Sequence, residues 1–317
     1  MTYQTAAISD DLITLPKLPG WVTSGRAETL ETVAFRSGAV LTVLDQLVSD
    51  QRHGVPVKLL ANKLALTAAT ASSKLEGRLS READIRDAYH LTPPGEARGP
   101  DGDLLAFWRD VARLRVGGTD EVAALVGPDF TGLVGIWLDA GLERAQTHGP
   151  LSGCVAVLRA VLEVDDRAER VACLLSDIVL ARAQNWQAVL PVTAQRLIKG
   201  MLRDLTTNGQ GAELAVQVRI LDSIEETIRL ARDLAHRAEA LRTVAPKLRA
   251  KGSDAAVALF LTEDALAPAS MLSPFVRGTS IPMTSRAARR FCDRLVELGV
   301  ARELTGRSTF RLYGIAA

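Results

Sequence analysis

The stretch that decides the fold class at the C-terminal end is SRAARRFCDRLVELGVARELTGRSTFRLYGI, residues 285–315. At 100° per residue, its apolar side chains gather on one side of a helix: Ala287, Phe291, Leu295 and Leu298. The opposite side carries Arg286, Arg289, Arg290 and Arg294, with Asp293 available to pair with Arg289 or Arg290. Thr284 or Ser285 suits the N-cap and Gly299 suits the position after the last turn. We therefore predict an amphipathic helix with one basic side.

Two short strands are predicted to follow this helix, over residues 300–304 and 309–313. A turn around Gly306 joins them and places Arg307 near its tip. Strand alternation puts Phe310 and Leu312 on one side of the second strand, and Arg311 and Tyr313 on the other.

Two more helical segments precede the amphipathic helix. Ser253 can cap a helix that runs to Leu261, and TEDALAPASML, residues 262–272, can supply a second short helix. Three helices followed by a two-stranded hairpin describe a winged helix, which we predict over residues 251–317. In such a module the basic helix enters the major groove of DNA and the wing faces the phosphate backbone. The candidate DNA-binding residues are Arg286, Arg289, Arg290, Arg294, Arg307 and Arg311, with Lys247, Arg249 and Lys251 just before the module.

The rest of the chain is predicted to be an all-α body. Residues 1–25 have no helical period and form an irregular lead-in around Trp21, and residues 26–250 form the body. Apolar residues recur at helical spacing over 30–48, 59–71, 104–114, 133–142, 151–162, 171–180, 192–205 and 212–241. The three prolines and three glycines of TPPGEARGPDGD predict a loop over residues 92–103.

The longest helical segment, residues 212–241, spaces its apolar residues at alternating intervals of three and four. That spacing is compatible with a coiled-coil seam between two chains. Several positions of the seam are alanines, which favour packing within the chain's own domain instead.

Charge is unevenly distributed along this chain of 317 residues, whose formal net charge is +1. Residues 237–317 hold 13 Lys and Arg against 7 Asp and Glu, whereas residues 1–236 hold 25 against 30. A basic end points to a polyanionic partner, although attraction between the two ends of the chain is an alternative. No apolar run is long enough for a membrane span and no leader is evident, so we expect a cytoplasmic protein.

Catalytic motifs are not found in the sequence. The four histidines are scattered at His53, His90, His148 and His236, outside any metal-binding spacing. No phosphate-binding loop and no G-x-S-x-G motif occurs. Cys154, Cys173 and Cys292 lie in apolar helical text, as buried thiols in a reducing compartment do. We therefore predict a protein that is not an enzyme and uses no cofactor or metal.

Two resemblances accompany these patterns. LPGW at 18–21, RVACLLSDIVLARAQNW at 170–186 and the text from 241 to 315 resemble a bacterial family known as domain of unknown function 1403, over nearly the whole chain. LTGRSTFRLYGI, residues 304–315, is similar to the C-terminal winged helix of many Fic-type proteins. SSKLEG, residues 72–77, is similar to the inhibitory helix of Fic AMP-transferases, which would give Glu76 a regulatory role. The catalytic H-x-F-x-[DE]-G-N-G-R stretch of that group is missing.

The leading functional hypothesis is a protein that binds double-stranded DNA through the winged helix, as a regulator or a plasmid or chromosome maintenance factor. Contact of three to five arginines with phosphates would give a log–log salt slope of roughly −3 to −4.5. The alternative is a scaffold whose winged helix docks a protein partner, with self-association open. A degenerate Fic-like protein, with a nucleotide-sized pocket near Glu76, is the third reading.

Overall fold

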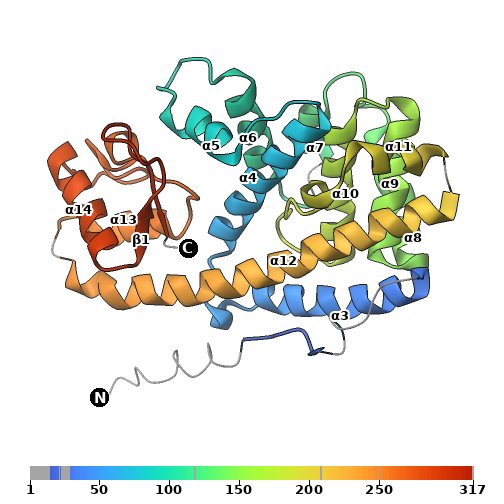
Figure 1. The fold of residues 1–317 in the computed structure, drawn as a ribbon, viewed down its shortest axis with the longest axis horizontal. Coiled ribbons are helices and arrows are strands. Elements are labelled where there is room, and N and C mark those ends of the chain that lie inside the picture. The colour runs from blue at the N-terminus through green and yellow to red at the C-terminus, as the bar shows by residue number, and fades with distance from the viewer. Residues whose placement is uncertain are drawn as a thin grey trace.

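The computed structural model describes residues 15–20, 22, 29–117, 119–207, 209–248 and 250–315, and Figure 1 shows its ribbon. Its α-helices are α3 (Leu30–Ser49), α4 (Val57–Leu75), α5 (Glu82–Leu91), α6 (Gly99–Val111), α7 (Thr119–Val126), α8 (Val134–His148), α9 (Pro150–Val164), α10 (Glu169–Ala183), α11 (Lys199–Thr207), α12 (Gly209–Val244), α13 (Ser253–Phe260) and α14 (Ser285–Glu297). Short helical turns are η1 (Gln51–His53), η2 (Thr193–Arg196), η3 (Ala245–Lys247) and η4 (Pro268–Leu272), and the strands are β1 (Ala301–Glu303) and β2 (Tyr313–Ile315). The predicted helical fold, with a small antiparallel sheet at the C-terminal end, is confirmed.

Helix α12 is the longest helix of the described chain and contacts both the helical body and the C-terminal elements. Its 36 residues extend about 54 Å and run under both the helical body and the C-terminal elements (Figure 1). It packs against α3 along one side and against α4, α9 and α11 on another, and its far end reaches β2. The apolar stripe predicted for this segment is buried within the chain, at Leu221, Ile224, Ile228, Ala231 and Ala235 among others.

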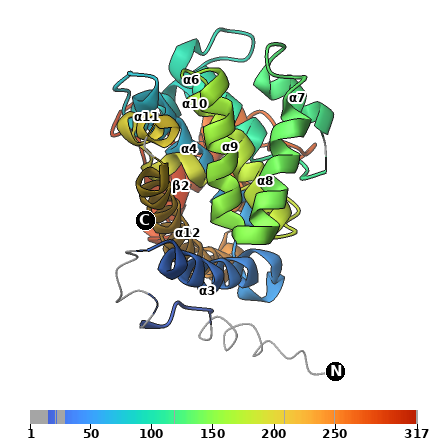
Figure 2. The same ribbon diagram turned by 90° about the vertical axis from the view of Figure 1, so that its right-hand side faces the viewer.

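Helices α8, α9 and α10 pack closely in the body, and Figure 2 shows α8 and α9 side by side. The contact depends on two glycines, because a Cβ on Gly153 would lie 2.5 Å from the carbonyl oxygen of Gly141. A Cβ on Gly141 would lie 2.4 Å from Cγ2 of Val157. The helix backbones can approach this closely only where side chains are absent.

Gly153→Ala is therefore expected to lower the free energy of unfolding by about 1–3 kcal/mol, because the added methyl overlaps the backbone of α8. Urea unfolding followed by circular dichroism measures the change. Gly38→Ala in α3 is the matched control, since a Cβ there meets no atom within 4 Å. It should raise stability by about 0.5–1 kcal/mol through helix propensity. Equal effects of the two substitutions would contradict the close approach of α8 and α9.

The C-terminal elements form a unit of α13, η4, α14 and the β1–β2 sheet. The strands are antiparallel with Ala301 opposite Ile315, and Tyr313 also forms an isolated bridge with Leu266. Backbone hydrogen bonds of 2.7 and 2.9 Å join Leu266 to Tyr313 in both directions. These bonds attach the segment before η4 to strand β2.

Three predicted boundaries in this helical chain are wrong. The loop predicted over 92–103 is shorter, because α6 already begins at Gly99, where Pro100 is tolerated in the first turn. The helix predicted over 192–205 is divided into η2 and α11, since Leu197 is extended and its side chain is buried. The short helix predicted over 262–272 is reduced to the π-helical turn η4, because Leu266 pairs with Tyr313 instead of continuing a helix.

The second predicted strand is also displaced. The sequence predicts it over 309–313, with Phe310 and Leu312 on one side and Arg311 and Tyr313 on the other, yet β2 begins at Tyr313. Phe310 has a φ of +53°, which takes it out of the extended conformation, and its side chain is 75% exposed. Hydrogen bonds from the amides of Thr305 and Gly306 to the Glu303 carboxylate shape the loop between the strands.

In the part of the chain that the structure describes, no helix combines the length and apolar character of a membrane span. Trp21, the predicted centre of the lead-in, lies outside the described residues. Leu15 and Val22, on either side of it, are buried.

Candidate nucleic-acid interface

Helix α14 has the ends that its sequence predicts, and its apolar side matches the prediction at Phe291 and Leu295, whereas Ala287 and Leu298 are only partly buried. Thr284 accepts a hydrogen bond from the Ala287 amide at its start, and Gly299 follows its end with a φ of +71°. The inward side chains are Ala288, Phe291, Cys292 and Leu295, which are all buried. Because this side is fixed against η4 and β1, the opposite side of the helix is held toward solvent.

The arginines predicted for that opposite side are all exposed. Arg286 and Arg290 form no ion pair with any residue that the structure describes, and the Arg289 side chain donates only to the carbonyl of Ser285, at 3.3 Å. Arg294 pairs with Glu297 at 2.9 Å, at the other end of the helix. The positive charge without a carboxylate partner is therefore concentrated in the first half of α14.

The helical spacing predicts that Asp293 can pair with Arg289 or Arg290. In the structure it pairs with neither. Its carboxylate accepts a hydrogen bond from the Tyr313 hydroxyl at 3.0 Å and lies 3.9 Å from a guanidinium nitrogen of Arg311. The carboxylate is thus engaged with the strand side of the unit, which leaves the first-half arginines of α14 without it.

The hairpin loop is turned toward helix α5 of the body. Arg307 pairs with Asp87 at 3.2 Å, and Asp87 also pairs with Arg86 at 2.8 Å. Arg86 in turn donates to the carbonyl of Leu304 in the hairpin, at 3.1 Å. Arg307 and Arg311 are exposed, but each lies against a carboxylate. These contacts reduce the net positive charge that the loop presents.

The remaining predicted residues lie before the module. Lys247 in η3 and Lys251 are exposed, whereas Arg249 lies outside the described residues. The chain next to Lys251 touches the segment that leads into α14, because a Cβ on Gly252 would lie 2.9 Å from Ile281. Lys251 therefore belongs to the same end of the unit as Arg286.

The sequence pattern did not single out every exposed residue of this unit. Arg277, in the segment before α14, is exposed, and no local pattern distinguished it from its polar neighbours. Strand alternation places Phe310 on the same side as Leu312, but its left-handed backbone turns it outward, whereas Leu312 is buried. The position of Phe310 between Arg307 and Arg311 in the sequence was the signal that could have indicated an exposed side chain.

A buried polar cluster fixes the C-terminal unit to α5 and α6. Arg109 of α6, which is 1% exposed, pairs with both Asp264 and Glu263, and His90 of α5 lies 3.3 Å from the Asp264 carboxylate. Burial by itself raises the pKa of Asp264, but the charge and hydrogen bond of His90 and the charge of Arg109 outweigh it and lower that pKa to about 2. Asp264 is therefore ionised and paired at neutral pH.

Glu76, the residue singled out in the Fic-like motif, is the C-cap of α4. Its carboxylate pairs with Arg78 and with Arg170 of α10, each at 2.9 Å. Its regulatory role stays a prediction. Within the described ranges, no group of three or more His, Cys, Asp or Glu side chains could hold a metal ion.

Comparison with known proteins places the chain in a family. The model of the family described as "Protein of unknown function (DUF1403)" matches residues 6–315. The chain belongs to this family. The match covers the body and the C-terminal unit together, which confirms the resemblance seen in the sequence. No curated protein matches the chain. The family description assigns no activity.

Proposed function

We propose that this DUF1403 member binds double-stranded DNA through a winged helix over residues 251–317, as a regulator or maintenance factor. The order of elements supports this, since α13, η4 and α14 are followed by a hairpin, and Leu266 pairs with its second strand. In winged helices the helix before the hairpin enters the major groove. Here that helix is α14.

The observation that carries the proposal is the uncompensated charge on the first half of α14. Arg286, Arg289 and Arg290 are exposed without a carboxylate partner among the described residues, while the other side of the helix is fixed in the unit. Arginine contacts phosphates and reads guanine with two hydrogen bonds. Since Arg294, Arg307 and Arg311 lie against carboxylates, they take a smaller share of the binding.

Replacing Arg286, Arg289 and Arg290 together by Ala is expected to weaken binding to a random 20-base-pair duplex by at least about tenfold, in fluorescence anisotropy at low salt. Neutralising three phosphates corresponds to a log–log salt slope of roughly −3, which the variant should lose. Arg113, Arg203 and Arg229, exposed arginines of the body, give a triple Ala variant of equal net charge as control. Unchanged binding in the α14 variant, or equal losses in both variants, would reject the site.

A second function is favoured by a different observation, namely the apolar side chains exposed on the same unit. Phe310 is 75% exposed, Phe275 54% and Val296 38%. Such residues suit docking of a protein partner, as in the scaffold alternative. Duplex DNA should then not compete with a cross-linked partner, and Phe310→Ser should reduce cross-linking while the triple arginine variant does not.

A further inference from the structure

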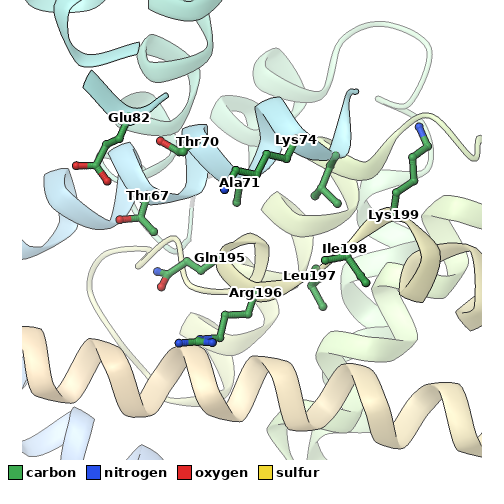
Figure 3. Close-up of a pocket in the computed structure, with 11 residues that line it drawn as sticks. Thr67, Thr70, Ala71, Lys74, Glu82, Gln195, Arg196, Leu197, Ile198 and Lys199 are labelled. Carbon is green, nitrogen blue, oxygen red and sulfur yellow. The ribbon is translucent and has the colours of Figure 1, made fainter. Parts of the chain in front are cut away.

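Away from the C-terminal unit, the body contains a pocket of about 460 Å³ between α4, the start of α5 and the segment from η2 into α11 (Figure 3). This volume falls within the range of small-molecule sites in proteins. The pocket is lined by Thr67, Thr70, Ala71, Lys74, Leu75, Glu82, Gln195, Arg196, Leu197, Ile198 and Lys199. Its residues are separate from those of the proposed DNA interface.

One wall is a single side of α4. Thr70 and Ala71 lie three and four residues after Thr67, and Lys74 lies four and three residues after them, which places all four on one side of the helix. This wall is about 10 Å long between Thr67 and Lys74. In Figure 3 the Lys74 side chain runs back along α4 toward Ala71, so its ammonium group lies over the pocket.

The basic side chains around the pocket differ in whether a carboxylate neutralises them. Lys74 is exposed and forms no ion pair with any described residue, whereas Lys199 pairs with the buried Glu169 at 2.9 Å and Arg196 pairs with Glu226. Those two carboxylates hold their basic partners in place at the opposite wall. Lys74 is the cation that an incoming anion could neutralise, because an ammonium group acts as a point charge toward phosphate.

The other end of this α4 wall accepts hydrogen bonds. The hydroxyls of Thr67 and Thr70 donate to the carbonyls of Lys63 and Leu66, which leaves their oxygens as acceptors. The carboxylate of Glu82 lies beside them in Figure 3, at the end of the pocket away from Lys199. Hydroxyl groups of a ligand can donate to these oxygens.

We infer that this pocket binds a phosphate monoester that carries hydroxyl groups, of the class of sugar phosphates and nucleoside monophosphates. The phosphate lies against Lys74, and the hydroxyls face Glu82, Thr67 and Thr70. The small apolar residue Ala71 forms the floor between the two ends.

Calorimetric titration of the full chain with ribose 5-phosphate and with adenosine 5′-monophosphate tests the inference. We expect millimolar or tighter binding of at least one of them, no binding of ribose, and a loss of about tenfold in affinity in Lys74→Ala, as for a charged hydrogen bond. Lys58→Ala is the matched control, because Lys58 is an exposed lysine of the same helix about 24 Å from Lys74.

A second variant, Ala71→Leu, fills the pocket floor without changing charge and should abolish binding in a chain whose melting temperature shows that it is folded. Absence of binding of both phosphate esters, equal losses in Lys74→Ala and Lys58→Ala, or tighter binding of glutarate than of either ester would overturn the inference. Duplex DNA is absent from the titration, so failure here leaves the DNA proposal untouched, and failure of DNA binding leaves this site untouched.

Discussion

Arg109→Met lowers the free energy of unfolding by about 3–5 kcal/mol, which is the cost of removing one partner from a buried ion pair. The guanidinium bonds Asp264 and Glu263 and lies 5.0 Å from the centre of the Tyr89 ring. Methionine fills much of the same volume, so the loss arises mainly from Asp264, which stays buried with His90 as its remaining close partner.

Chemical unfolding at pH 7 measures this loss. Arg113→Met is the matched control, because Arg113 lies just after α6 and pairs with Asp110 where both side chains are more than half exposed. Exposed pairs contribute at most about 1 kcal/mol. A loss below about 1 kcal/mol in Arg109→Met would contradict the role assigned to the cluster.

The same cluster makes the free energy of unfolding fall at acid pH. The pKa of Asp264 is about 2 in the folded chain, below its ordinary value of 3.8, so its ionised form stabilises the fold above about pH 4. That contribution is lost as the pH falls from about 4 to 2. Without Arg109 the pKa of Asp264 is lowered less, so the stability that Asp264 contributes is lost over a narrower range of pH.

The amphipathic helix at the C-terminal end could be predicted because all its signals are local. The cap at Thr284, the buried Phe291 and Leu295, and Gly299 after the last turn fall within one segment, and the structure has each of them. The four exposed arginines follow from the same periodicity. Burial of the long α12 stripe was likewise indicated by its alanines.

The partners of those side chains could not be predicted, since they come from distant segments. Arg307 meets Asp87 and Arg109 meets Asp264, pairs separated by more than 150 residues in the sequence. His90 was only one of four scattered histidines until the fold brought it against Asp264. The pocket has the same origin, because α4 and the segment after η2 contribute opposite walls.

Asp177, within α10, is expected to make stability depend on pH near neutrality. Its Oδ1 accepts hydrogen bonds from the amides of Val192 and Thr193, at 3.1 and 2.9 Å, and from the Thr193 hydroxyl at 2.6 Å. Its Oδ2 is buried without a hydrogen-bond partner among the described residues. Burial raises the pKa of this carboxyl to about 7, against the lowering effect of the three hydrogen bonds.

The sign follows from the proton that the folded state keeps. Between pH 4 and 7 the folded chain holds a proton on Asp177 that the unfolded chain has released, so stability falls as the pH rises through this window. The fall is about 1.4 kcal/mol for each pH unit, up to about 4 kcal/mol in total. Above pH 7 the full penalty of the buried carboxylate remains.

Asp177→Asn should remove this dependence, because the amide keeps the Oδ1 acceptor and cannot ionise. Its free energy of unfolding, measured in urea at pH 5, 6, 7 and 8, should rise relative to that of the unchanged chain as the pH increases. Asp165→Asn is the control, since Asp165 accepts a hydrogen bond from the Arg167 amide at an exposed helix end. Parallel stability curves for Asp177→Asn and the unchanged chain would show that the buried carboxyl is not protonated in this range.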